Sequence, residues 1–208
     1  TKIKASSNLQ AAEFMSSLNE ALKACTFTDK HSYYSFAPLR PLKNSVKVFV
    51  DGKDYFSDLY EALINAKTEV LMSIWCFSPK VYLRRPITNW GDESRLDRVL
   101  KKIADRGVKV YIHLFSGIKI VMKYGGKENA KYLESLSPNI RALWYPTHSM
   151  NPTTPHLKLI VIDQEISFVG GIDLGYGRYD ISSHPIIDPV YEEGKGAMFP
   201  GNDYQNEQ

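Results

Sequence analysis

The chain has 208 residues, of which 43% are hydrophobic and 24% are charged, a composition typical of a globular domain that excludes a disordered tail and a collagen-like repeat. This length fits one domain or one lobe of a larger enzyme. The formal net charge of +3 suits anionic surfaces or phosphate substrates, but a charge this small does not by itself indicate nucleic-acid binding.

Cysteine content and the N-terminal sequence bear on the compartment. The two cysteines, Cys25 and Cys76, have no metal-ligand spacing, and so few in a chain of this size favour the cytoplasm over a disulfide-built secreted fold. No apolar run is long enough to span a bilayer, and no apolar core follows the first four residues as it would in a secretory signal. We therefore expect a cytoplasmic protein whose association with membranes is peripheral.

The N-terminal region is predicted to be separate from the rest. Apolar residues recur at helical spacing from Asn8 to Ala24, which predicts an amphipathic helix. Prolines and aromatic residues between Thr26 and Leu42 indicate a connector. We expect residues 1–44 to form an N-terminal helix and connector, and residues 45–208 to form the main lobe.

Strands and helices alternate through the main lobe. The apolar patterns and turn residues predict a strand over 46–50, a helix over 56–64, a strand over 69–75, a helix over 96–103, a strand over 108–114, a helix over 127–136 and a strand over 140–145. Such alternation is typical of an α/β fold, here a mixed β-sheet sandwiched by helices.

The next segment changes in character. Three prolines between residues 146 and 155 predict little regular structure, and the segment could line the mouth of a site. His148 within it fits either a pocket wall or a packing role in the loop. Two strands are predicted next, His156–Asp163 and Ile166–Asp173, with so short a connection that they form a hairpin.

The first of these strands carries a candidate catalytic pair. His156 and Lys158 are two residues apart, so their side chains share one face of a strand. If residues 164–165 form a two-residue loop, Lys158 lies opposite Gly171 and His156 lies opposite Asp173, roughly 5 Å away. Asp173 would then orient the imidazole or shift its charge state. Alternatively, Asp173 has no such role and is simply an acidic residue at the end of a strand. Gly171 would leave room for a phosphate beside Lys158.

Asp163 is assigned to the turn. It lies five residues beyond Lys158 and on the opposite face of the strand, so at about 3.3 Å per residue the two are roughly 16 Å apart. We therefore do not expect its carboxylate to take part in the chemistry.

These residues are similar to a known family signature. The pattern His156-x-Lys158-x4-Asp163-x6-Gly170-Gly171 resembles that of the phospholipase D superfamily. Further blocks at 35–40, 50–56, 75–79, 84–86, 175–180 and 199–204 resemble, in the same order, the first catalytic half of its eukaryotic members. The resemblance covers most of residues 35–206 and implies that residues 45–208 form a phospholipase D-like catalytic lobe.

The resemblance also implies a reaction. Enzymes of this type hydrolyse a phospholipid phosphodiester, or transfer it to an alcohol, with phosphatidylcholine giving phosphatidic acid and choline as the expected case. One neutral histidine attacks phosphorus to form a phosphohistidine, and a second protonates the leaving alcohol. By resemblance His156 is the nucleophile, and Lys158 neutralises the phosphate oxygens. No cofactor and no metal are expected, and the membrane surface is the expected partner.

The sequence departs from the family pattern in two places. Pro155 stands where relatives usually have another histidine beside His156, which a strand start tolerates. The family also uses two copies of the motif, whereas this chain contains one, because His184 has no lysine two residues on. We therefore expect a second catalytic half, from a C-terminal segment or from a second copy of the chain.

Four further residues are candidates for substrate binding. Trp75 fits either a core position or the wall of the site. Arg84 and Arg85 could grip an anionic head group or cover apolar surface. Arg178 belongs to the block at 175–180 and is included on that ground.

Two other classes of function remain open. A nuclease of the same superfamily would use the same centre, but it should show a basic, aromatic-lined groove, and the sequence gives no sign of one, so no nucleic acid partner is expected. A non-catalytic binding or regulatory protein could retain the half-site without its partner.

Overall fold

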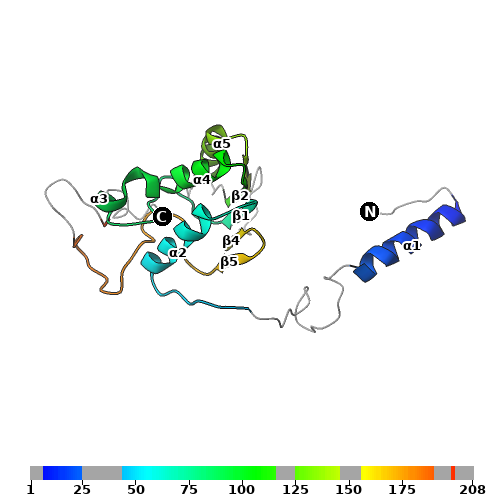
Figure 1. Cartoon of the computed structure of the whole chain (residues 1–208), viewed down its shortest axis with the longest axis horizontal. Helices are drawn as coiled ribbons and strands as arrows, with labels where there is room; N and C mark the ends of the chain where they lie inside the picture. Colours follow the sequence, from blue (N-terminus) through cyan, green and yellow to red (C-terminus); the bar gives the residue numbers. More distant parts are fainter. Residues whose placement is uncertain (1–6, 25–43, 116–124, 146–155, 190–197, 200–208) are drawn as a thin grey trace. The chain divides into compact units, whose positions relative to one another are not determined.

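The computed structural model describes residues 7–24, 44–115, 125–145, 156–189 and 198–199 (Figure 1). The chain divides into two units, Thr1–Lys47 and Val48–Gln208. The first contains helix α1 (Asn8–Ala24), as the sequence predicted; the domain boundary expected at residue 44 stays a prediction. Within the described ranges, none of the helices combines the length and the apolar character needed to cross a bilayer.

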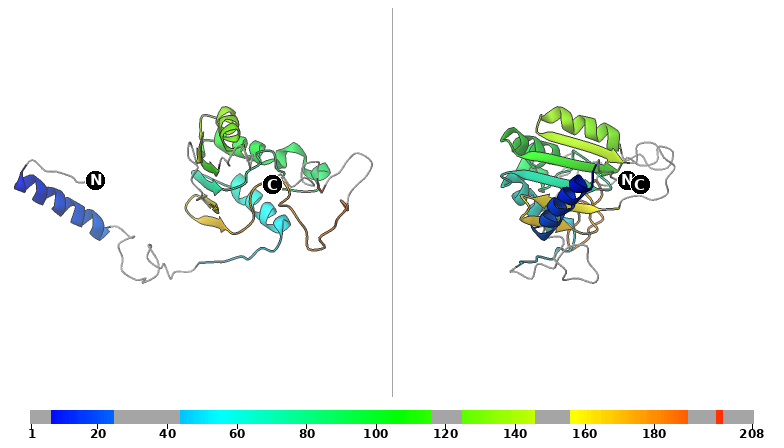
Figure 2. Two further views of the ribbon diagram at one scale, coloured as in Figure 1. Left: turned by 180° about the vertical axis from the view of Figure 1, so that it is seen from behind. Right: turned by 90° about the vertical axis from the view of Figure 1, so that its right-hand side faces the viewer.

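The second unit is built on a five-stranded sheet, whose strands Figure 2 shows side by side. The strand order is β3-β2-β1-β4-β5; β1, β2 and β3 run parallel, while β4 pairs antiparallel with both β1 and β5. Its elements, in chain order, are α2 (Gly52–Ile64), β1 (Glu69–Ile74), α3 (Ile87–Trp90), the 3-10 helix η2 (Gly91–Ser94), α4 (Leu96–Asp105), β2 (Lys109–Phe115), α5 (Gly126–Leu136), β3 (Ile140–Tyr145), β4 (Lys158–Ile162) and β5 (Ile166–Val169). The predicted α/β class, a mixed sheet with flanking helices, is confirmed.

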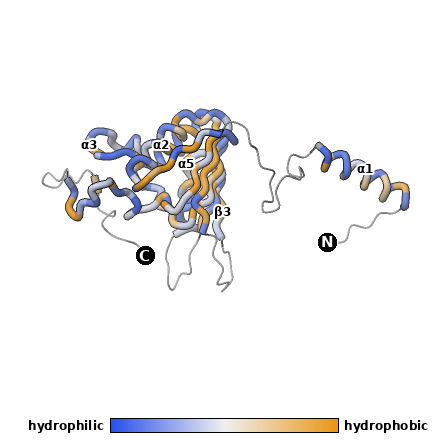
Figure 3. The backbone as a smooth tube through the Cα atoms, turned by 90° about the horizontal axis from the view of Figure 1, so that it is seen from below, coloured by the Kyte–Doolittle hydropathy of each residue, from blue (hydrophilic) through white to orange (hydrophobic). Residues whose placement is uncertain are grey.

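One face of the sheet forms the core. Alternate residues of β1, β2, β3 and β4 point to this face and pack against α2, α4 and α5, and in Figure 3 the sheet shows apolar colours interleaved with pale and polar ones. On the opposite face Leu71, Tyr111 and Leu143 are exposed, and they line an open apolar hollow of about 400 Å³. Parallel strands are normally covered on both faces, so this second face is suited to burial by further polypeptide.

The strand predicted over 46–50 is not formed. Val46, Val48 and Val50 are 83%, 83% and 77% exposed, and it is Phe49 that packs inward, with its ring 6.1 Å from the ring of Tyr55. Lys47 is exposed as well, so Phe49 alone anchors this segment and the valine alternation does not correspond to a buried face. The helix that follows also begins earlier than predicted, at Gly52.

The hairpin between β4 and β5 forms with a different register from the one predicted. Asp163 and Gln164 both have positive φ (53° and 56°), and the N–H of Glu165 donates to the carbonyl of Ile162 over 3.0 Å. Two consecutive left-handed residues closed by this bond are typical of a type I′ turn, but the strands pair again only from Ile166, so residues 163–165 form a three-residue connection in place of the expected two-residue loop. Ile162 therefore pairs with Ile166, and every predicted cross-strand pair is displaced by one residue.

Candidate active site

The site begins at the first residue of β4. Lys158 is buried, while His156 lies just before the strand and is exposed. The Nζ of Lys158 is 3.2 Å from Nε2 of His156. An ammonium group can only donate hydrogen bonds, so Nε2 accepts this one and the ring proton is placed on Nδ1. The two side chains converge, as the sequence predicted.

Asp173 meets Lys158, not His156. Its carboxylate lies 3.2 Å from the Lys158 ammonium, and the two side chains are 2% and 3% exposed. The backbone N–H of Cys76 donates a second hydrogen bond to Asp173 over 2.9 Å. Charges this deeply buried are tolerated only when they are paired and hydrogen-bonded. Asp173 therefore fixes the position of the lysine.

The predicted pairing of His156 with Asp173 on facing strands is wrong in geometry. Both residues lie outside the strands, and the one-residue change of register sets Gly170, not Gly171, opposite Lys158, with a 3.3 Å bond from the Gly170 N–H to the Lys158 carbonyl. Because β5 ends at Val169 and the chain bends, Asp173 still returns to the lysine. A Cβ placed on either glycine would meet no atom within 4 Å, so the space expected for a phosphate is open.

A tyrosine of α2 lies in the electrostatic field of Asp173. Burial, and then the negative charge of Asp173, raise the pKa of Tyr55 far above its usual value. Its phenol therefore stays protonated. No sequence pattern distinguished Tyr55, because a tyrosine on the apolar face of a helix is usually an ordinary core residue.

Trp75 contacts both His156 and Lys158. It follows the last residue of β1, and its ring lies 4.5 Å from the ring of His156, centre to centre. The Lys158 ammonium lies 4.8 Å from the centre of the same ring, within the range of a cation–π interaction. Trp75 therefore lies beside His156 and Lys158, and its role in substrate binding stays a prediction.

Asp163 lies in the turn, as predicted, but its carboxylate also has a partner. It accepts hydrogen bonds of 2.8–3.0 Å from the backbone N–H groups of Lys67, Thr68 and Glu69 and from the Thr68 hydroxyl. Desolvation alone would raise the pKa of Asp163, but these bonds outweigh it and hold the pKa at about 2. Asp163 thus joins the β4–β5 turn to the segment that leads into β1.

The two neighbouring arginines are held by aromatic rings. The guanidinium of Arg84 lies 4.5 Å from the ring of Tyr60 and 4.2 Å from the ring of Trp90. Arg85 lies 4.2 Å from the ring of Tyr179 and donates a 2.7 Å bond to the carbonyl of Met198. These contacts favour the structural role over the head-group role that the sequence left open.

The remaining two candidates are less informative. The carbonyl of Arg178 packs so closely on α2 that a Cβ at Gly52 would lie 2.4 Å from it, which explains the glycine at that helix start. The Arg178 side chain is half-buried. His148 lies outside the described residues.

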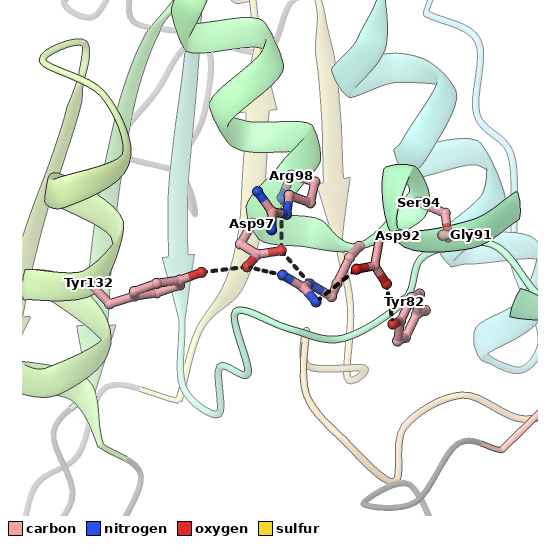
Figure 4. A network of polar contacts seen from close by, with 8 residues as sticks. Tyr82, Gly91, Asp92, Ser94, Asp97, Arg98 and Tyr132 are labelled. Atoms are coloured by element: carbon pink, nitrogen blue, oxygen red, sulfur yellow. Dashed lines mark hydrogen bonds and ion pairs between the residues drawn. The ribbon is translucent and has the colours of Figure 1, made fainter.

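A polar network that the sequence analysis missed connects two helices (Figure 4). Asp97, buried at the start of α4, accepts bonds from Arg95 (2.8 Å), from the N–H of Arg98 (2.8 Å) and from the Tyr132 hydroxyl of α5 (2.6 Å). Burial acts to raise the pKa of Asp97, but the bonds from Arg95 and Tyr132 outweigh it, and the pKa falls below its usual value. No sequence signal separates a buried Asp97 from the acidic residue that any helix start favours.

A second cluster lies near the amino end of α2. One oxygen or nitrogen atom from each of Asp51, Asp180 and His184 lies within 4.8 Å of the others, a grouping that sequence spacing did not reveal. His184 Nδ1 is 2.7 Å from an Asp180 oxygen, and this bond raises the pKa of His184. The charge of the third member, Asp51, raises the pKa of His184 further.

The chain is similar to named proteins over most of its length. "Phospholipase D1" of Saccharomyces cerevisiae is 34% identical over 209 residues, which are 99% of this chain and 12% of that protein. "Phospholipase D1" of Mus musculus is 35% identical over 165 residues, which are 78% of this chain and 15% of that protein. The chain therefore spans less than a fifth of the length of these relatives.

Comparisons with family models and with solved structures give weaker results. No family model matches the chain. Among solved structures, Nuc from Salmonella typhimurium, described as a phospholipase D family member, aligns with a TM-score of 0.40 and 19% identity over 58% of this chain and 65% of that one.

Proposed function

The chain belongs to the phospholipase D superfamily, a family of phosphodiesterases, and from this premise we propose that it supplies one half of a phospholipase D active site. The proposed reaction is hydrolysis of a phospholipid phosphodiester, or its transfer to an alcohol, through a phosphohistidine. The observation that carries the proposal is the 3.2 Å contact between Lys158 Nζ and His156 Nε2, with the lysine fixed by Asp173.

This contact suggests how the nucleophile is activated. Nε2 of His156 carries the lone pair that attacks phosphorus, and Lys158 occupies that lone pair while the site is empty. When a phosphate enters the open space beside the two glycines, its oxygens attract the ammonium, and Nε2 is released for attack. Lys158 then stabilises the negative charge that builds up on the phosphate oxygens. Asp173 acts as a positioning residue for the lysine.

The bond changes require a second histidine. Nε2 of His156 forms the N–P bond as the P–O bond to the alcohol breaks, and the leaving oxygen takes a proton from a charged imidazole. Water then attacks phosphorus, the second imidazole, now neutral, takes the proton of the water, and the N–P bond breaks. One ring cannot be neutral for attack and charged for protonation in the same step. A second motif must therefore come from a C-terminal segment or from a second copy of the chain related by a two-fold axis.

The uncovered face of the sheet supports the need for further polypeptide. Its exposed apolar side chains form a patch of the kind that marks an interaction surface. The yeast and mouse relatives are far longer than this chain, which matches 12–15% of their length. Because the block at 199–204 resembles the junction that precedes the second half in eukaryotic members, we favour a C-terminal segment as its source. Phosphatidylcholine at the membrane surface is the proposed substrate.

Trapping the covalent intermediate tests this function. The chain is mixed with short-chain phosphatidylcholine or with bis(4-nitrophenyl) phosphate, quenched, and analysed by mass spectrometry. Nitrophenolate leaves without a proton, so the isolated chain should react slowly with the second compound and not with the lipid. Adding a polypeptide that carries the second motif should extend reaction to the lipid. No adduct in any mixture would leave the binding protein as the explanation, and an adduct with an oligonucleotide but not the lipid would favour the nuclease.

A further inference from the structure

We propose that the loop His184–Asp188 is a membrane-insertion element, in which Ile186 and Ile187 enter the apolar layer of a phospholipid bilayer. The two isoleucines are 92% and 76% exposed, and they are adjacent in sequence. Exposing one large apolar side chain is ordinary, but two neighbours at the tip of one loop are a specific feature. The choice of a bilayer as partner rests on the proposed phospholipid function.

The loop is fixed at both ends. At its start, the N–H of His184 donates to the carbonyl of Ile181 over 2.8 Å, and its ring bonds to Asp180. At its end, the buried carboxylate of Asp188 accepts 2.9 Å bonds from the N–H groups of Met198 and Phe199. Only three residues lie between the two anchors.

The anchors explain how the loop can hold apolar side chains in water. Pro185 restricts the backbone between them, so fewer conformations are open to the segment that carries the two exposed isoleucines. The second anchor is itself held, because Arg85 donates to the Met198 carbonyl and Phe199 packs edge-on against Tyr179. A loop that is already ordered loses little conformational entropy when it binds a bilayer.

The loop lies at the same end of the unit as the reactive pair. The N–H of Lys53, in the first turn of α2, donates to the carbonyl of Asp180. Helix α2 is roughly 20 Å long and ends just before β1 begins, so its amino end lies towards the end where β1 finishes at Ile74. Ile74 pairs with Lys158. Insertion of the loop would therefore bring a lipid phosphate layer towards His156 and Lys158.

Vesicle binding by the full chain tests the proposal. The wild type, the double variant Ile186→Ser/Ile187→Ser and the control Leu143→Ser are sedimented with phosphatidylcholine vesicles. Leu143 is also exposed, at 70%, but it lies on the uncovered sheet face. We expect the wild type and the control to bind alike, and the double variant to bind at least roughly tenfold more weakly, because each isoleucine loses most of its favourable transfer energy.

A fluorescent residue placed in the loop reports insertion directly, and this signal does not depend on the folding stability of the variant. In Ile187→Trp, the added tryptophan should be quenched by vesicles of brominated phosphatidylcholine beyond the quenching seen for the wild type. Equal binding of the wild type and the double variant, an equal loss in Leu143→Ser, or no vesicle binding at all would overturn the proposal. None of these measurements uses catalysis, so their failure is distinct from failure to form the phosphohistidine.

Discussion

Lys158 and Asp173 form a buried ion pair, with 3.2 Å between Nζ and Oδ2. Removing one partner of such a pair leaves an uncompensated charge in the interior. Asp173→Ala should therefore lower the free energy of unfolding by about 3–5 kcal/mol, measured by urea denaturation. As a control, Asp105→Asn breaks the exposed pair with Lys101 and should cost less than about 1 kcal/mol. Similar losses in the two variants would show that the buried pair has no special structural role.

The conservative change at the same position tests positioning. Asp173→Asn keeps an acceptor for the Cys76 N–H but removes the charge that holds the lysine. We expect a folded protein in which adduct formation with bis(4-nitrophenyl) phosphate slows by roughly tenfold or more, in line with the loss of a charged hydrogen bond. An unchanged rate in the folded variant would contradict the assigned role.

Asp163 should affect stability and leave the chemistry unchanged. In Asp163→Asn the amide keeps one acceptor oxygen, so part of the bonding to residues 67–69 is lost, and the free energy of unfolding should fall by about 1–2 kcal/mol. The rate of adduct formation at 20 °C, below the unfolding transition, should be that of the wild type. Abolished adduct formation in a fully folded Asp163→Asn protein would show that the carboxylate takes part in the reaction.

The lowered pKa of Asp163 also makes the stability of the protein depend on pH. The pKa of Asp163 falls from 3.8 to about 2 on folding, so the unfolded chain takes up its proton first as pH decreases. The stabilisation is fully present above about pH 4 and is lost as pH falls towards and through 2. Urea unfolding between pH 5 and pH 2 should show the difference between wild type and Asp163→Asn shrinking. A difference that stays constant over this range would exclude the linkage.

Trp75 offers a test of the wall of the site. Trp75→Leu removes the ring that contacts His156 and Lys158. Since an aromatic contact contributes about 0.5–1.5 kcal/mol, adduct formation should slow by up to roughly tenfold, and Trp75→Phe should recover part of the rate. If Trp75→Phe and Trp75→Leu both react at the wild-type rate, the ring contact does not position the histidine.

The sequence predicted the α/β fold and the convergence of His156 and Lys158, because hydrophobic periodicity and the two-residue spacing are local properties. The hairpin register was missed because it depends on Asp163 and Gln164 adopting left-handed conformations, which these residue types adopt only in some contexts. Asp97 and Tyr55 were missed for another reason. Their environments are created by side chains from other elements, and no local pattern encodes such contacts.

The most direct test of the central claim locates the covalent adduct on the isolated chain, held at a concentration where sedimentation shows a monomer. After reaction with bis(4-nitrophenyl) phosphate, peptide mapping should find a single nitrophenyl-phosphoryl group on His156. His156→Ala should give none, and the wild-type monomer should not turn over short-chain phosphatidylcholine. An adduct on another residue, or robust lipid turnover by the monomer, would contradict the claim that this chain supplies one half of the site through His156.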